Sequence, residues 1–132
     1  MATVLILEDD SAIRSLLAES LRMARFDVFP VASPAEALTL LRSGLAVDVM
    51  VLDLMIQGAS STPFLKAVRK LPAYEHTPVI LSTGSEPAHG VYPPRELYQI
   101  LVRKPYRTSA LVEAVRELTG PPRRDRTAHQ PA

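Results

Sequence analysis

The sequence predicts one α/β domain in which helices cover both faces of a doubly wound, five-stranded parallel sheet. Short β-rich runs alternate with segments of helical periodicity, which is the pattern of successive strand–helix units. The run at residues 47–52 is apolar over nearly its whole length, as a parallel strand buried on both faces must be. The length of 132 residues suits a single hydrophobic core.

The first strand and helix are predicted close to the N-terminus. Residues 4–7 are apolar and are followed by three acidic residues, 8–10. Asp10 or Ser11 is placed to cap the free N–H groups at the start of the helix. The apolar residues that recur at helical spacing are Ile13, Leu16, Leu17, Leu21 and Ala24.

The second strand and helix have clear boundary signals. Residues 26–31 read as a strand, and Pro30, which cannot donate to a ladder, indicates a position at the sheet edge. Residues 33–36, Ser-Pro-Ala-Glu, read as a capping box with proline at the first helical position. Gly44 suits the left-handed residue just past the end of this helix.

The middle of the chain supplies the third unit. Residues 47–52 form the third strand, which we expect to be central because it is apolar on both faces. Thr62-Pro63 starts a third helix that runs through Leu71, and residues 78–82 form the fourth strand.

The last third of the chain is less regular. The segment after Thr83 is interrupted by Pro87, Gly90, Pro93 and Pro94, so a fourth helix, if present, is short or irregular. Residues 98–103 read as the fifth strand. Thr108 can cap a final helix that runs through Leu118 and is closed by Gly120. The proline- and arginine-rich remainder has the composition of a disordered tail.

Composition excludes several classes of function. The absence of cysteine excludes disulfides, thiolate metal sites and cysteine nucleophiles, and the three histidines lack metal-ligand spacing. A net charge of +1 gives no field that favours nucleic acid. No apolar run approaches the roughly 20 residues of a membrane span, and no signal peptide is recognisable, so we expect a cytoplasmic protein.

Ionisable and hydroxyl side chains fall at or just after the ends of four predicted strands. They are Glu8, Asp9, Asp53, Thr83 and Lys104. In a doubly wound sheet, ligands bind at the carboxyl ends of the strands, so these side chains should converge there. Three adjacent carboxylates repel unless a cation is present, and an all-oxygen cluster suits Mg²⁺. A lysine and a threonine that can bond oxygen complete a site for phosphoryl transfer to a carboxylate.

These residues, in this order and approximate spacing, resemble the receiver domain of two-component response regulators over residues 2–120. The resemblance implies a flavodoxin-like sheet of strand order 2-1-3-4-5, with a receiver domain at residues 1–120 and a tail at residues 121–132. Because only about a dozen residues follow Gly120, we expect a stand-alone receiver that acts by docking to a downstream protein.

The resemblance also implies a role for each site residue. Asp53 would accept a phosphoryl group from a sensor histidine kinase or phosphotransfer protein. Glu8 and Asp9 would hold Mg²⁺ together with Asp53 and the backbone carbonyl of Met55. Lys104 would hold the acceptor and phosphoryl oxygens, and Thr83 would move toward the phosphoryl group to change the protein's surface.

The chain departs from the family pattern at three positions, and two further positions are ones that vary within the family. Leu101 stands where the family has an aromatic switch residue, and Gln57 and Ser61 replace a common proline and glycine after the acceptor. Met55 and Ser85 occupy two variable positions that influence autodephosphorylation, and neither is an acid or amide that orients water well. We therefore expect an atypical output surface and a long-lived phosphoryl group.

Other classes fit the residues less well. A haloacid dehalogenase-type hydrolase needs a second acid, and a cobalamin-binding module needs a histidine, at the position of Met55. A nucleotide-binding domain needs a glycine-rich turn after the first strand, where acidic residues 8–10 would repel phosphates. The open alternative is a receiver-like interaction module that binds its partner regardless of phosphorylation.

Overall fold

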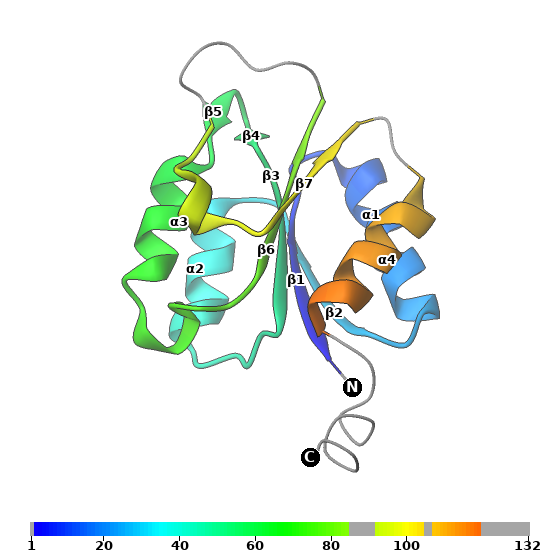
Figure 1. Cartoon of the computed structure of the whole chain (residues 1–132), viewed down its shortest axis with the longest axis horizontal. Helices are drawn as coiled ribbons and strands as arrows, with labels where there is room; N and C mark the ends of the chain where they lie inside the picture. The colour runs from blue at the N-terminus through cyan, green and yellow to red at the C-terminus, as the bar shows by residue number, and fades with distance from the viewer. Residues whose placement is uncertain (1, 85–91, 105–106, 120–132) are drawn as a thin grey trace.

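A five-stranded parallel sheet divides the molecule into two layers of helices (Figure 1). The computed structural model describes residues 2–84, 92–104 and 107–119. The strands of this sheet are β1 (Thr3–Leu7), β2 (Asp27–Val31), β3 (Val49–Asp53), β6 (Val79–Thr83) and β7 (Ile100–Arg103). Their order is β2-β1-β3-β6-β7, which confirms the predicted doubly wound arrangement.

Helices cover both faces of the sheet. They are α1 (Ser11–Met23), α2 (Pro34–Arg42), α3 (Thr62–Arg69) and α4 (Thr108–Thr119). Figure 1 shows α1 and α4 on one face and α2 and α3 on the other. No helix in the described parts of the chain has both the length and the apolar character needed to cross a membrane.

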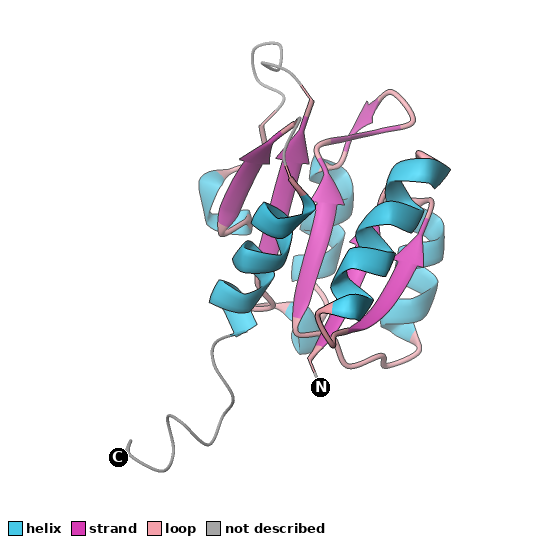
Figure 2. Cartoon of the chain, turned by 90° about the vertical axis from the view of Figure 1, so that its right-hand side faces the viewer, coloured by secondary structure: helices cyan, strands magenta, loops and turns pink. Residues whose placement is uncertain are grey.

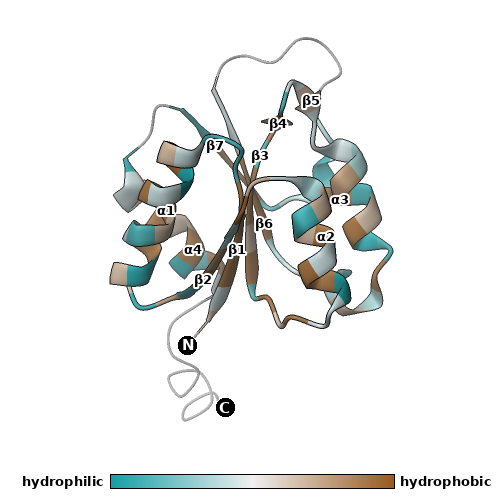
Figure 3. Cartoon of the chain, turned by 180° about the vertical axis from the view of Figure 1, so that it is seen from behind, coloured by the Kyte–Doolittle hydropathy of each residue, from teal (hydrophilic) through white to brown (hydrophobic). Residues whose placement is uncertain are grey.

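Strand residues alternate between two hydrophobic clusters. Leu5, Met50 and Leu81 pack on the α2 and α3 side, whereas Val51 and Ile80 pack on the α1 and α4 side. This alternation follows from the two-residue period of a strand. The hydropathy colouring in Figure 3 shows apolar residues along the central strands, between the helix layers. β3 is central, as the apolar run at residues 47–52 predicted.

Local signals marked an edge strand and two helix caps correctly, although the strand limits differ from the predicted ones by up to two residues. Pro30 lies in β2, which is an edge strand. The Asp10 carboxylate accepts a hydrogen bond from the Ile13 N–H at 2.9 Å and so caps α1. Gly44 follows α2 with φ of +93°, the left-handed conformation expected of it.

The capping box before α2 is shifted by one residue. The Glu36 N–H donates to Ser33 Oγ at 3.2 Å, as predicted. The Glu36 carboxylate accepts a hydrogen bond from the Ala32 N–H at 2.8 Å, one residue before the usual partner.

Two predicted helix limits were wrong. The third helix ends at Arg69 rather than at Leu71, which is extended, with φ of −87° and ψ of 116°. Leu71 precedes Pro72, and a residue before proline is disfavoured in the helical conformation. Thr108 is the first residue of α4 rather than the residue before it. Gly120 and the predicted tail lie outside the described residues.

A two-stranded hairpin between β3 and α3 was not predicted. β4 (Met55–Ile56) pairs antiparallel with β5 (Ala59–Ser60). Its two turn residues, Gln57 and Gly58, have φ of 53° and 79°. Two successive positive φ values match the twist of a tight hairpin. The hairpin lies beyond the carboxyl ends of the parallel strands (Figure 2).

The connection from β6 to β7 contains only a 3₁₀ turn, η2 (Arg95–Leu97), among its described residues. Residues 85–91 of the expected short or irregular helix lie outside the described ranges. Arg69 of α3 donates to the carbonyl oxygens of Tyr74, Thr77 and Leu97 at 2.7–2.8 Å. These bonds fix η2 against α3.

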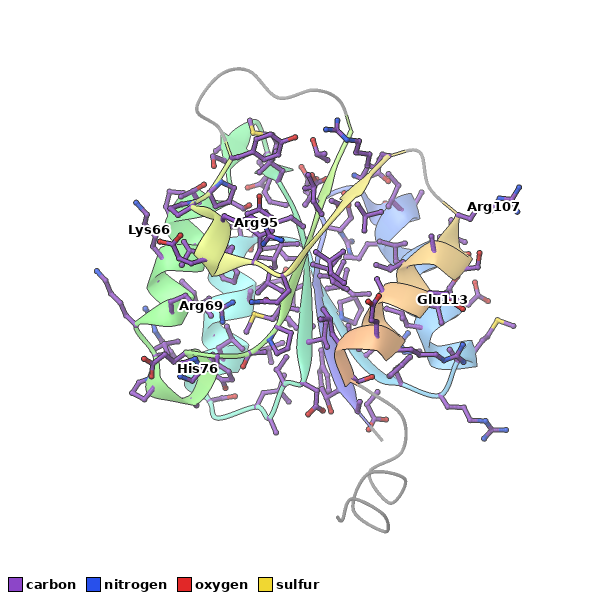
Figure 4. The ribbon with its side chains drawn as sticks, in the orientation of Figure 1. Lys66, Arg69, His76, Arg95, Arg107 and Glu113 are labelled. Carbon is purple, nitrogen blue, oxygen red and sulfur yellow. The ribbon has the colours of Figure 1, made fainter. Side chains whose placement is uncertain are left out.

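The 3₁₀ turn η1 (Pro72–Tyr74) is fixed to the chain that follows α2. The buried Tyr74 hydroxyl lies 2.8 Å from the Leu41 carbonyl oxygen and 2.6 Å from that of Leu45. His76, just beyond η1, lies at the end of the molecule opposite the β4–β5 hairpin (Figure 4). This histidine is therefore remote from the carboxyl edge of the sheet.

Replacement of Tyr74 by Phe tests the contribution of this hydroxyl to stability. The ring remains, but the single O–H donor that the two carbonyl oxygens share is lost. We expect the free energy of unfolding to fall by about 1–2 kcal/mol, measured by urea denaturation. A change within experimental error would show that the hydroxyl adds nothing to the stability of this junction.

Candidate functional site

Three acidic side chains meet at the carboxyl edge of the sheet. Glu8 and Asp9 directly follow β1, and Asp53 is the last residue of β3. β1 and β3 are adjacent and parallel, with Leu7 paired to Leu52, so the residues after them lie side by side. Each carboxylate offers an oxygen within 4.8 Å of the other two. The sequence placed these acids at strand ends, and the register brings them together.

Lys104 lies among these acids although it is distant in the sequence. Its Nζ is 2.9 Å from Asp53 Oδ2 and 3.4 Å from Glu8 Oε1. Burial by itself would lower the pKa of Lys104. The hydrogen bond and negative charge of Asp53, with those of Glu8, outweigh burial and raise the Lys104 pKa above its ordinary value. The ammonium group therefore stays charged in this site.

Glu8 is the most buried acid of the cluster, with its side chain 3% exposed. Burial raises its pKa, while the Asp10 N–H and Lys104 act in the opposite direction without cancelling the effect. Glu8 Oε2 accepts a hydrogen bond from the Asp10 N–H at 3.1 Å. Without a bound cation, the folded protein thus holds a carboxylate that is costly to ionise.

The chain itself offsets part of the expected repulsion. Backbone N–H groups of the hairpin donate to two carboxylates: Met55 to Asp53 Oδ1 at 3.2 Å, and Gln57 to Asp9 Oδ2 at 2.9 Å. Together with Lys104 and the Asp10 N–H, these donors serve five of the six carboxylate oxygens. Within the described residues, Asp9 Oδ1 receives no hydrogen bond. The cluster is therefore ordered by protein donors, and one of its six carboxylate oxygens receives no hydrogen bond from the described residues.

Thr83 and Lys104 are joined through the backbone. Thr83 is the last residue of β6 and is buried, and its carbonyl oxygen accepts a hydrogen bond from the Lys104 N–H at 2.7 Å. The register pairs Thr83 with Arg103, directly before Lys104. The ends of β6 and β7 are thus held together beside the acidic cluster.

The positions that depart from the expected pattern have distinct surroundings. Leu101 is partly buried and packs against the core on the α2 and α3 side. Met55 is 39% exposed. Ser61 is buried, and its hydroxyl has no hydrogen-bond partner in the described chain. Ser85 lies outside the described residues.

Two contacts at the site were not anticipated from the sequence. One is the Gln57 N–H bond to Asp9, which depends on the hairpin conformation. The other is Arg14, whose Nη1 donates to the carbonyl oxygens of Glu8 at 2.8 Å and Asp9 at 3.4 Å. The Gln-Gly pair could have suggested a turn. The spacing of Asp10 and Arg14 suggests only a helical ion pair, which the structure does not contain.

A doubly wound sheet with an acidic triad and a lysine at its carboxyl edge defines a receiver-type signalling domain. A family model for the response regulator receiver domain matches residues 4–116. The chain therefore belongs to the response regulator receiver family. Domains of this family are the phosphoacceptors of two-component signalling; they generally bind Mg²⁺ in an acidic pocket and interact with histidine kinases or phosphotransfer proteins.

Individual relatives agree with this assignment. The transcriptional regulatory protein CpxR of Escherichia coli is 36% identical over 88 residues, which are 65% of this chain and 36% of CpxR. The matched region is thus little more than a third of that relative. In structure, Vibrio cholerae chemotaxis protein CheY4 has a TM-score of 0.80 at 24% identity, covering 89% of this chain and 98% of CheY4.

A second solved structure has the same fold. The receiver domain of the Francisella response regulator 1452 gives a TM-score of 0.75 at 24% identity. The similarity covers 90% of this chain and 97% of that receiver domain.

The raised pKa of Glu8 predicts a pH-dependent stability in metal-free buffer. The folded state holds a proton that the unfolded state releases near pH 4.5, so the free energy of unfolding should fall as pH rises above that value. Glu8→Gln lacks this ionisation. We expect the variant to gain stability relative to the native protein between pH 4.5 and 7, measured by urea unfolding in EDTA.

With Mg²⁺ present at pH 7, we expect the native protein to be more stable than Glu8→Gln. A cation that binds the native acidic cluster stabilises the folded protein by mass action, whereas Glu8→Gln lacks one ligand. The same unfolding series with saturating Mg²⁺ tests the reversal. A pH-independent difference between the two proteins in EDTA would contradict the assignment of the raised pKa to Glu8.

Proposed function

We propose that this receiver accepts a phosphoryl group on Asp53 from a sensor histidine kinase or phosphotransfer protein, in a Mg²⁺-dependent relay. The phosphorylated form then docks to a downstream protein. The observation that carries this proposal is the 2.9 Å contact of Lys104 Nζ with Asp53 Oδ2, beside the carboxylates of Glu8 and Asp9. The site thus places an acceptor, a positive charge and candidate metal ligands together.

The chemistry requires little covalent help from the protein. An Asp53 oxygen forms a bond to phosphorus while the P–N bond of phosphohistidine breaks and the imidazole leaves. Such transfers depend on positioning and charge neutralisation. Lys104 is placed to bond an acceptor oxygen and a phosphoryl oxygen. The Asp53 side chain is 12% exposed, so it is reached from one side only.

The donor set fits a hard divalent cation. Glu8, Asp9 and Asp53 would hold Mg²⁺ through carboxylate oxygens, the ligands that this ion prefers. Asp9 Oδ1 needs no other bond broken before it can ligate. When bound, Mg²⁺ supplies positive charge that neutralises the phosphoryl oxygens during transfer.

The hairpin supports Met55 as a fourth ligand through its carbonyl oxygen. In a two-residue hairpin, the pair that flanks the turn, here Ile56 and Ala59, is the hydrogen-bonded pair. The Met55 N–H and C=O therefore point away from Ser60. Because the Met55 N–H reaches Asp53 Oδ1, its carbonyl faces the same side as the acceptor.

Thr83 is the proposed link from phosphorylation to output. Its movement toward the phosphoryl oxygens would change the relative populations of two conformations that present different surfaces. Thr83 is bonded through its backbone to Lys104, so a shift at one strand end is shared with β7. Leu101 cannot act as an aromatic switch, so we expect the output surface to involve η2 and β7 in a different way.

The proposed unit is a stand-alone cytoplasmic receiver at residues 1–120, followed by a tail at residues 121–132. It is a phosphoacceptor rather than an enzyme, apart from slow autodephosphorylation. The alternative is an interaction module that binds a partner without phosphorylation, which Leu101 and the 3₁₀ turn η2, among the described residues between β6 and β7, favour.

Phosphorylation by a small-molecule donor distinguishes these two functions. With Mg²⁺ and acetyl phosphate, the native protein should gain one phosphoryl group, detected by intact mass. Asp53→Ala should gain none, because the acceptor oxygen is gone. Asp27→Ala, at an exposed residue that starts β2, is the control and should behave as native. An unmodified native protein would support the interaction module.

The lifetime of the phosphoryl group should depend on Met55. Its side chain is exposed at the rim of the site and cannot orient an attacking water, so loss of phosphate should be slow. Met55→Asn adds a group that can orient water and should speed the loss severalfold, measured after removal of donor. Met23→Asn, at a methionine that is 79% exposed on α1, is the control. Rapid loss from the native protein would contradict the expectation.

A further inference from the structure

Arg14 contacts the acid-bearing loop through the backbone. Its Nη1 donates to the Glu8 carbonyl oxygen at 2.8 Å and to the Asp9 carbonyl oxygen at 3.4 Å. In the described chain, Arg14 forms no ion pair with a carboxylate. Its positive charge is thus directed to two peptide carbonyls, and these belong to the two residues proposed as cation ligands.

The position of Arg14 on α1 explains this contact. Arg14 is the fourth residue of α1, and helical side chains lean toward the N-terminus. A long side chain there covers the loop that enters the helix. The Asp10 cap and the Arg14 N–H bond to the Asp10 carbonyl at 2.8 Å fix the helix against the same loop. Arg14 therefore joins α1 to the loop.

We propose that Arg14 is a positioning residue for the cation site: by holding the carbonyls of Glu8 and Asp9, it sets how their two side chains meet Asp53. The Gln57 N–H restrains the Asp9 side chain, and the other backbone restraints on this loop within the described residues act at Glu8 and Asp10. The Glu8 N–H donates to the Val31 carbonyl at 3.1 Å, and the Asp10 N–H donates to the Glu8 carboxylate. Arg14 supplies the restraint on the peptide groups on either side of Asp9.

A purely electrostatic effect of Arg14 would change Mg²⁺ affinity in the opposite direction. A nearby positive charge repels a divalent cation, so if charge dominated, removal of the guanidinium would strengthen Mg²⁺ binding. If orientation dominates, removal weakens binding, because partners that orient metal ligands are typically worth 10- to 100-fold in affinity. The direction of the change therefore separates the two effects.

Arg14→Met tests the proposal, with Arg22→Met as a matched control. Arg22 lies on the same helix, about 12 Å further along, and also donates to a backbone carbonyl, that of Val28 at 3.1 Å. Arg14→Met loses guanidinium contacts to two carbonyl oxygens and Arg22→Met loses one, but only Arg14 faces the acidic loop. Comparison of the two separates loss of positioning from general destabilisation of α1.

Mg²⁺ affinity is the primary measurement, by isothermal titration calorimetry, since the chain has no tryptophan to report binding. We expect Arg14→Met to weaken Mg²⁺ binding by about 10-fold and Arg22→Met to leave it unchanged. At saturating Mg²⁺, the rate of phosphorylation by acetyl phosphate should return to the native value in Arg14→Met. Circular dichroism checks that both variants fold.

The inference rests on the proposed function, and its failure can be told apart from failure of that function. If native protein binds Mg²⁺ and takes a phosphoryl group, unchanged or tighter binding by Arg14→Met overturns the positioning role alone, as does equal weakening by Arg22→Met. If native protein does not bind Mg²⁺, both proposals fail. Should Arg14→Met not fold, Arg14→Lys replaces it: weakened binding supports the role, and native affinity overturns it.

Discussion

The structure depends on the balance of charge at the carboxyl edge of its sheet. The carboxylates of Glu8, Asp9 and Asp53 face one ammonium group, that of Lys104, so the site carries two surplus negative charges. In the metal-free protein, burial raises the pKa of Glu8, and the neighbouring charge of Asp53 adds to this effect. A divalent cation would remove the surplus, which is why a donor set of oxygens and one fixed lysine suits both Mg²⁺ and a phosphoryl group.

Loop backbone, rather than further side chains, completes the site. N–H groups of Asp10, Met55 and Gln57 each donate to a different carboxylate of the cluster. The β4–β5 hairpin delivers two of these donors because its tight turn returns the chain over the ends of β1 and β3. A proline at residue 57 would lack the N–H that reaches Asp9. The hairpin is therefore part of the site as well as the connection to α3.

The segments that lead into β6 and β7, away from the carboxyl edge, have an unusual support. Burial lowers the pKa of Arg69. Its guanidinium donates to three backbone carbonyl oxygens in or near η1 and η2, which solvate the buried charge. Leu101 packs into the adjoining core, where it offers bulk but no polar group. Leu101 therefore has no aromatic ring whose rotation could link the site to this surface.

The sequence by itself determined the order of the strands and helices apart from the β4–β5 hairpin, the left-handed residue at Gly44, the edge position signalled by Pro30, and the set of polar residues at strand ends. These follow from local rules, since a cap, a proline or an apolar run acts on its immediate neighbours. Tertiary structure decided what depends on register and turn geometry. The 2.9 Å contact between Asp53 and Lys104 joins residues 51 positions apart, and the donors at Gln57 and Arg14 became partners of the acids only once the hairpin and α1 were placed.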